Sequence, residues 1–224
     1  MKPERKAAYE LAKKQVPGKF LAAAKAFGLQ KRSVMAYFVN YHLQTGFFND
    51  FADYLANRNN YKLSRDEAFA IWGYTTNLFY RELNEELRSN RFSARSYPLS
   101  RLIISGLKKL PAYKGKAWRH FALGQNQLAH YLAANAEKKT VFCWQFLSCG
   151  NPEESALRNK SGRNIVEFYR KVDARDISEL ADGIRYRAYP PKELIIFPPK
   201  IFRVKDATNL GENYYISLVE TELK

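Results

Sequence analysis

The sequence predicts an α+β protein, with helices in the first half of the chain and strands prevailing in the second. Up to residue 110, apolar residues recur at the three- and four-residue spacing of amphipathic helices. Beyond Pro111, short runs alternate apolar and polar positions, which is the pattern of strands with one buried face. A chain of 224 residues is long enough to bury one good core and to carry a small helical lobe.

The composition is that of a folded and strongly basic protein. Hydrophobic residues make up 46% of the chain, and 37 Lys and Arg against 22 Asp and Glu give a net charge of +15. The charge is spread along the chain, so it favours an acidic protein face, nucleic acid, an anionic membrane surface or a pyrophosphate ligand. No apolar run approaches the roughly 20 residues that span a bilayer. We therefore expect no integral membrane segment.

The N-terminal stretch MKPERKAAYELAKK is charged and lacks the apolar core of a secretory signal. We expect a cytoplasmic protein, or an effector delivered into a target cell by a specialised system. Cys143 and Cys149 are predicted to be free thiols on one strand, which fits a reducing compartment. The histidines show no ligand spacing with these cysteines, so no metal site is expected.

The helical part begins with a lobe predicted for residues 1–62, and residues 63–224 are expected to form the main part of one compact molecule. Helical spacing predicts segments at residues 5–14, 18–27, 33–43 and 47–56. Their many aromatic residues are interpreted as the core between these helices.

A capping box, Ser64 with Glu67, opens a long amphipathic helix predicted for residues 64–88. Further helices are predicted at residues 98–110 and 125–138. Each of them is a periodic stretch bounded by turn residues.

Three polar residues on predicted strands are candidates for chemistry. Arg119 lies inside the strand of AYKGKAWRHFAL, where it is either exposed or holds an anion. Ser148 lies near the end of the strand TVFCWQFLSC, residues 140–149, and by itself is an ordinary strand-end residue. Glu193 begins KELIIFPPKIFRV, two short strands joined by a Pro-Pro turn, and is either a solvated glutamate or a carboxylate placed for reaction. Other strands are predicted at residues 163–172 and 214–222.

The order of these segments resembles the mono-ADP-ribosyltransferases of clostridial-toxin and vertebrate ecto-transferase type, whose signature is Arg, then Ser-Thr-Ser, then Glu-x-Glu. The resemblance covers about residue 64 to the C-terminus. It implies helices packed on a β-sandwich core of two antiparallel sheets, and NAD as the substrate. It also implies that Glu193 is catalytic, that Arg119 grips the phosphate and ribose of NAD, and that Ser148 orients Glu193.

The resemblance also assigns two tyrosines to the NAD cleft. Tyr74, in the string EAFAIWGYTTNLFYRELNEELR, lies on the helix that flanks the cleft in such enzymes. Tyr189, with Tyr186 on the loop before Glu193, is a candidate to stack on nicotinamide or to touch the acceptor. Packing within the loop is the alternative for these two loop tyrosines.

Pro191 departs from the family pattern, because it stands where the upstream Glu or Gln of Glu-x-Glu is found. Proline offers neither an acid nor a hydrogen-bond donor, so the pattern disfavours transfer to arginine. Cys149 and Gly150 replace the second and third residues of Ser-Thr-Ser. The favoured prediction is a transferase that moves ADP-ribose to an acidic protein or a nucleic acid. An NAD glycohydrolase and a non-catalytic basic binding module are the alternatives, and the oligomeric state stays open.

Overall fold

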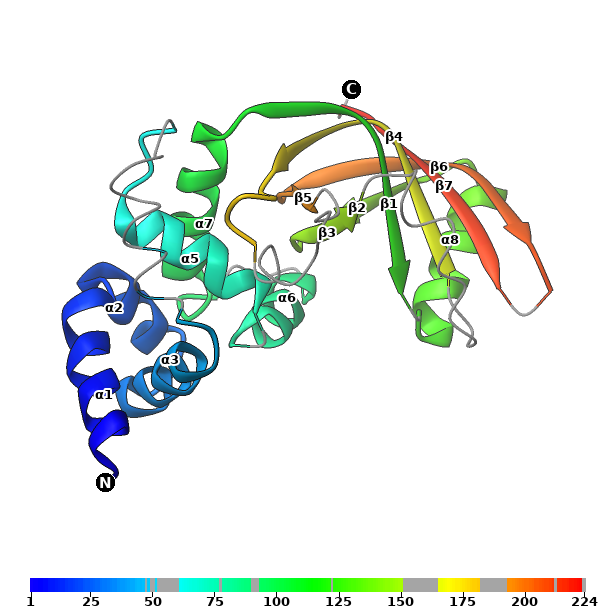
Figure 1. Cartoon of the computed structure of the whole chain (residues 1–224). Coiled ribbons are helices and arrows are strands. Elements are labelled where there is room, and N and C mark those ends of the chain that lie inside the picture. Colours follow the sequence, from blue (N-terminus) through cyan, green and yellow to red (C-terminus); the bar gives the residue numbers. More distant parts are fainter. Residues whose placement is uncertain are drawn as a thin grey trace. The chain divides into compact units, whose positions relative to one another are not determined.

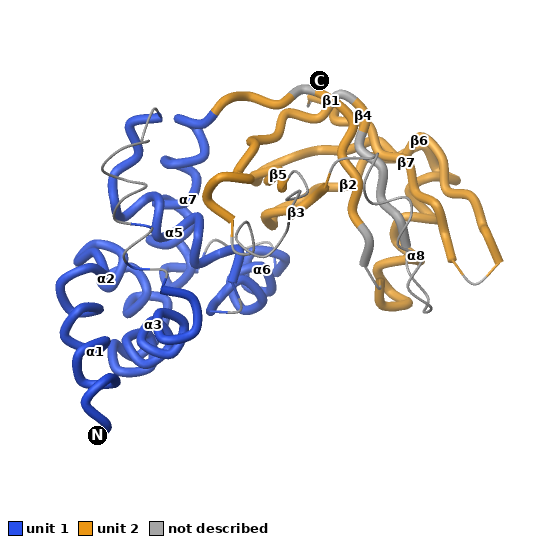
Figure 2. The backbone as a smooth tube through the Cα atoms, in the orientation of Figure 1, with its two compact units in different colours: residues 1–110 blue, residues 111–224 orange. Residues whose placement is uncertain are grey.

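The computed structural model forms two compact units, Met1–Leu110 and Pro111–Lys224 (Figures 1 and 2). The boundary expected after residue 62 lies inside the first of these units. The structure describes residues 1–46, 48, 51, 61–76, 78–89, 93–121, 123–150, 165–181, 193–211 and 213–222. None of the helices within these ranges is long and apolar enough to cross a membrane.

The first unit is helical. Its elements are α1 (Pro3–Gln15), α2 (Gly18–Ala26), α3 (Lys31–Thr45), α5 (Arg65–Thr75), α6 (Tyr80–Arg88) and α7 (Tyr97–Lys109). The helix expected over residues 98–110 is thus confirmed as α7.

Aromatic side chains fill the core of the first unit, as the sequence predicts. Phe20, Phe38 and Phe69 are at most 1% exposed. Phe38 stacks on Trp72 with ring centroids 5.1 Å apart, and its ring lies edge-on to Phe69 at 5.6 Å. Because α2, α3 and α5 each contribute rings, this cluster joins the three helices into one core.

The prediction of a single helix over residues 64–88 is wrong, because the structure has two helices there, α5 and α6. The Thr76 hydroxyl donates to the Gly73 carbonyl at 2.8 Å and accepts from the Leu78 amide at 3.1 Å. Thr76 itself is extended, with φ −92° and ψ 178°. Threonine side chains that bond the local backbone compete with helical hydrogen bonds, which explains the break.

In the part of the second unit that the structure describes, there are strands and one helix. Its elements are β1 (Ala112–Phe121), α8 (Gln125–Ala136), β2 (Thr140–Cys143), β3 (Leu147–Gly150), β4 (Ile165–Asp176), β5 (Glu193–Ile196), β6 (Lys200–Asn209) and β7 (Tyr214–Glu220). The α+β prediction is confirmed. Apolar side chains of these strands, among them Val172, Leu194 and Ile216, form the core of this unit.

The strands form two sets that share β4. In one set, β1, β3, β5 and β4 close into a ring of antiparallel pairs. The other set continues from β4 through β7 and β6 to β2, and hydrogen bonds thereby join all seven strands into one sheet. The pairing of β4 with β7 is parallel, which corrects the expectation of antiparallel pairs alone.

The strand predicted over residues 140–149 is in fact two strands. β2 pairs with β6, whereas β3 pairs with β5, so the chain passes from one set to the other between Cys143 and Leu147. Cys143 and Cys149 are free thiols, as predicted, but they lie on different strands. The Pro198-Pro199 turn, whose peptide bond is cis, makes the reverse passage from β5 to β6.

Candidate active site

Glu193 is the first residue of β5, where the strand leaves the buried core. The next three residues, Leu194, Ile195 and Ile196, are at most 1% exposed, whereas Glu193 is half-buried. An apolar run fixes the strand in the core, and its first residue therefore holds a carboxylate at the core's edge. This position keeps the acid accessible while its backbone stays rigid.

The backbone of Glu193 is fixed on both sides by the segment that follows β4. Its amide donates to the Ser178 hydroxyl oxygen at 2.9 Å, and its carbonyl accepts from the Ile177 amide at 2.9 Å. The Ser178 hydroxyl donates to Asp176 at 2.6 Å, and the Ser178 amide donates to the same carboxylate oxygen at 3.0 Å. Asp176 therefore orients the serine that accepts from Glu193.

Ser148 contacts the Glu193 carboxylate directly. Its hydroxyl donates to Oε1 of Glu193 at 3.3 Å. In the register of β3 and β5, Gly150 lies opposite Glu193, which puts Ser148 two residues along on the same face. The structure thus brings together the two residues that the resemblance pairs.

The register of three strands also brings Arg119 near this point. Trp118 of β1 pairs with Gly150 of β3, and Gly150 pairs with Glu193 of β5. Arg119 follows Trp118 directly, so its backbone lies one position from this line across the strands. Because neighbouring residues of a strand point to opposite faces, the register places Trp118, and not Arg119, on the face of Ser148 and Glu193. The Arg119 side chain is half-buried and its Nη1 atom is fully buried.

Of the tyrosines predicted for the cleft, the structure describes Tyr74 alone. Tyr74 is 4% exposed in the first unit, and its hydroxyl accepts from the Asn84 amide group at 2.9 Å. Tyr186, Tyr189 and Pro191 lie outside the described residues. The assignment of these tyrosines to NAD stays a prediction.

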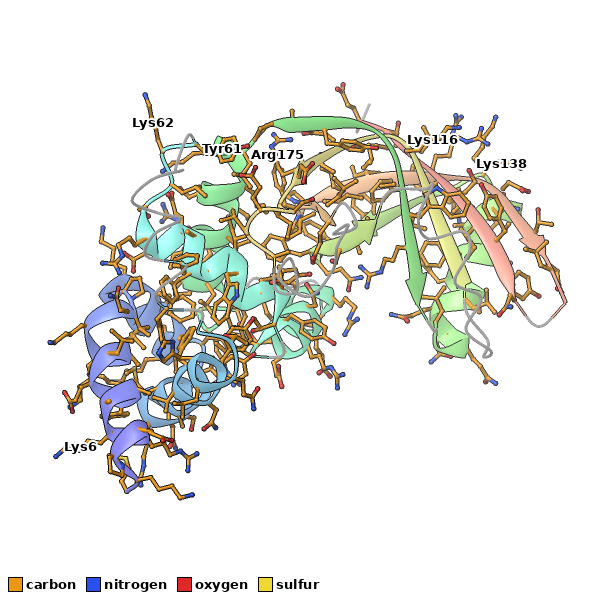
Figure 3. All side chains as sticks on the ribbon, in the orientation of Figure 1. Lys6, Tyr61, Lys62, Lys116, Lys138 and Arg175 are labelled. Atoms are coloured by element: carbon orange, nitrogen blue, oxygen red, sulfur yellow. The ribbon has the colours of Figure 1, made fainter. Side chains whose placement is uncertain are left out.

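A charged cluster stabilises the end of β4 that adjoins β5. Asp173 pairs with Arg175 and lies 3.6 Å from Lys200, which also bonds Glu220. Burial alone would raise the pKa of Asp173, but the hydrogen bonds and charges of Arg175 and Lys200 outweigh it and hold the pKa below its ordinary value. Arg175, labelled in Figure 3, lies opposite Ile195 in the register and its guanidinium stands over the Phe197 ring at 5.2 Å.

Sequence reasoning missed Asp176 and Ser178 as supports of Glu193. The segment ARDISEL is part of the resemblance, yet nothing in its spacing shows that the serine meets a strand fifteen residues later. The available signal was a pair of turn-forming polar residues, Asp176 and Ser178, a few positions after the strand predicted over residues 163–172.

Comparison with known structures finds proteins that share this arrangement of strands and helices. The structure matches the ADP-ribosyltransferase HopU1 of Pseudomonas syringae pv. Tomato DC3000 with a TM-score of 0.62 over 99% of this chain and 98% of that one, at 17% identity. The chain has the ADP-ribosyltransferase fold. The type III effector XopAI of Xanthomonas axonopodis pv. citri has the same fold, with a TM-score of 0.65 over 99% of this chain and 89% of that one, at 13% identity.

Sequence comparison supports the same assignment over part of the chain. A stretch of 121 residues is 37% identical to the NAD(+)--protein-arginine ADP-ribosyltransferase Tre1 of Serratia proteamaculans (strain 568), and covers 49% of this chain. The match covers 26% of Tre1, so the chain spans about a quarter of the length of this ADP-ribosyltransferase. No protein-family model matches the chain.

Proposed function

We propose that this chain is an NAD-dependent mono-ADP-ribosyltransferase that cleaves the bond between nicotinamide and ribose and transfers ADP-ribose to a protein. The observation that carries the proposal is the hydrogen bond from Ser148 to the Glu193 carboxylate. In the strand register, the backbone of Arg119 lies one position from the line that joins Gly150 and Glu193. Arg119, Ser148 and Glu193 stand at the positions of the Arg, the first Ser and the second Glu in the signature that the sequence resembles, and three separate strands contribute them. The similarity to Tre1 and to HopU1 supports the same activity.

The chemistry requires a carboxylate beside the reacting ribose. As the glycosidic bond breaks, nicotinamide leaves with the bonding electrons and becomes neutral, while positive charge develops on the ribose. We assign Glu193 to the ribose 2-hydroxyl, because a hydrogen bond to an ionised acid strengthens as that charge appears. The acceptor nucleophile then bonds to C1 of the ribose and gives up its proton to Glu193 or to solvent.

Arg119 is proposed to hold the phosphates of NAD. A guanidinium presents paired donors that match two phosphate oxygens at once. Ser148 is proposed to fix the rotamer of Glu193, since its hydroxyl donates to one oxygen of that carboxylate.

The acceptor is proposed to be a protein side chain. Tre1 is named for protein arginine, which favours arginine, whereas Pro191 removes the upstream acid of Glu-x-Glu. This substitution favours a second candidate, NAD glycohydrolase activity, in which water takes the place of the acceptor. Delivery into another cell is part of the proposal and is supported by the likeness to a type III effector.

The test is incubation of the purified chain with NAD labelled in the adenylate part, together with a cell lysate, with agmatine as a small guanidine, or with buffer alone. We expect label on lysate protein and release of nicotinamide. Glu193→Gln is expected to lower both by at least about a hundredfold, since the charge that stabilises the transition state is lost.

Glu179→Gln is the matched control, because this neighbouring glutamate is exposed and its removal changes the charge equally. It should keep full activity. Label on agmatine as well as on protein would identify arginine as the acceptor. Nicotinamide release without retained label would support the glycohydrolase. Unchanged turnover in Glu193→Gln would contradict the site assignment, and no turnover in the unaltered chain would contradict the enzymatic proposal.

A further inference from the structure

A groove of about 920 Å³ lies in the first unit, between α1 and α3. One wall is formed by Arg5 and Tyr9, one helical turn apart on α1, and the other by α3 residues that include Arg32 and Val39. Arg5 donates to the Asn40 side chain across the groove at 2.8 Å, so the two walls are fixed to each other. None of these residues belongs to the candidate active site.

The rim of the groove is cationic. Lys2, Arg5, Lys31 and Arg32 line it from both walls, and all four are exposed. Among the residues that the structure describes, no acidic side chain contributes to the lining. Residues 1–46, which form this helical region, contain nine Lys and Arg but only two acidic residues. One of the two, Glu10, already pairs with Lys13 at 2.9 Å. The groove therefore attracts a ligand that carries several negative charges.

The interior of the groove is apolar. Val39, which is 4% exposed, and Ala36 line it from α3, and half-buried Tyr9 lines it from α1. Small anions such as phosphate would contact the rim and leave this interior empty. A ligand that uses the whole groove needs apolar side chains between its acidic groups.

We propose that this groove is a docking site for an acidic, amphipathic segment of a protein partner. Apolar side chains of the segment enter between α1 and α3, and its carboxylates pair with the rim, as when an amphipathic helix binds in a hydrophobic groove. This proposal goes beyond the proposed catalytic function and does not depend on NAD turnover.

Nucleic acid is a poorer match for the same surface. Binding of single strands without sequence preference relies on aromatic faces that stack on bases. Tyr9 is the aromatic residue among the described residues that line the groove, and the Lys13 ammonium lies over its ring at 4.8 Å from the centroid. A phosphate backbone also makes no use of the apolar interior. The combination of charge and apolar surface therefore selects a peptide.

The test measures binding of a fluorescent sixteen-residue peptide that carries Glu on one helical face and Leu on the other, by anisotropy with the full chain. Lys31→Glu with Arg32→Glu is expected to weaken binding about tenfold or more, because charge attraction becomes repulsion. Ala36→Trp is expected to weaken it similarly without a change of charge, because the indole fills the groove.

Lys6→Glu with Lys14→Glu is the matched control. Both lysines are exposed on α1 and neither lines the groove, and Figure 3 shows that Lys6 points away from the helix into solvent. This variant should weaken binding no more than about twofold through long-range charge. Glu193→Gln should bind the peptide normally, which separates docking from catalysis.

Three results would overturn the proposal. Absence of peptide binding to the unaltered chain would exclude the acidic segment. Equal loss in both charge-reversal variants with no effect of Ala36→Trp would show general attraction to a basic surface. Tighter binding of a single-stranded DNA 20-mer that competes with the peptide would assign the groove to nucleic acid. Circular dichroism and melting temperatures of each variant would show that its helices are intact.

Discussion

At the scale of single residues, the candidate site depends on hydrogen bonds that connect non-adjacent segments. Ser178 accepts from the Glu193 amide and donates to Asp176, so one hydroxyl couples the end of β4 to the start of β5. The side chain of Ser178 does not meet the Glu193 carboxylate in these bonds. Its role is to hold the first residue of β5 in place, so Ser178 affects turnover only through the position of Glu193.

Replacement of Ser178 by Ala is expected to lower kcat for NAD consumption about tenfold with little change in KM. Loss of the hydroxyl leaves the Glu193 amide without its acceptor and releases the strand start, and displacements below 1 Å are costly in a preorganised site. Steady-state kinetics of nicotinamide release measures both parameters.

Ser178→Thr keeps the hydroxyl and should restore most of kcat. If only the size of the side chain mattered, the larger threonine would not restore kcat. Equal loss in the Ala and Thr variants, or a change confined to KM, would contradict the positioning role.

At the scale of elements, a buried carboxylate joins two helices of the first unit. Glu67 caps α5 through its bond from the Ser64 amide at 2.7 Å, and it accepts from Ser105 and Lys109 of α7 at 2.6 and 2.7 Å. Burial alone would raise the pKa of Glu67, but these hydrogen bonds and the charge of Lys109 hold the pKa below its ordinary value of 4.5. The ionised form therefore stabilises the packing of α5 on α7.

Glu67→Gln is expected to lower the free energy of unfolding at pH 7 by about 2 kcal/mol, the typical effect of losing hydrogen bonds to a charged group. Because the folded pKa is depressed, the contribution of Glu67 is complete well above pH 4.5 and is lost as pH falls below that value. The difference between wild type and variant should therefore shrink from pH 6 towards pH 3, as measured by urea denaturation.

The exposed Glu82 of α6 offers the control, because the structure shows it on the solvent face of its helix. Glu82→Gln should leave stability nearly unchanged. A difference for Glu67→Gln that stays constant across this pH range would contradict the role of its ionised form.

At the scale of the whole molecule, each unit has its own core. The first is an aromatic cluster between helices, and the second is an aliphatic core of the sheet with α8 packed against β2 and β6. Units with separate cores are able to unfold separately. Trp72 is 1% exposed in the first core and reports on that unit alone, whereas Trp118 and Trp144 belong to the second.

Phe38→Ala is expected to lower the denaturation midpoint seen by Trp72 fluorescence, since removal of a buried phenyl ring costs about 3–5 kcal/mol. With Trp118 and Trp144 replaced by Phe, Trp72 gives this signal alone. With Trp72 replaced by Phe instead, the remaining tryptophans follow the second unit, whose midpoint should stay nearly constant. Coincident shifts in both signals would show that the units unfold as one.

The sequence by itself determined the elements with strong periodicity and the residues of the motifs. The capping box at Ser64 and Glu67, the helix before Pro111 and the strands on either side of Pro198-Pro199 depend on local interactions, and the structure confirms them. Arg119, Ser148 and Glu193 could be selected because their order and spacing along the chain resemble a known signature.

Tertiary structure decided where local preference was ambiguous. The break at Thr76 depends on the hydrogen bonds of its hydroxyl with the Gly73 carbonyl and the Leu78 amide. The spacing of apolar residues carries no information about these bonds. The division of residues 140–149 follows from the pairing of β2 with β6 and of β3 with β5, and strand partners are chosen across long stretches of sequence. The meeting of Ser178 with Glu193 has the same origin, since only the folded register brings these segments within hydrogen-bond distance.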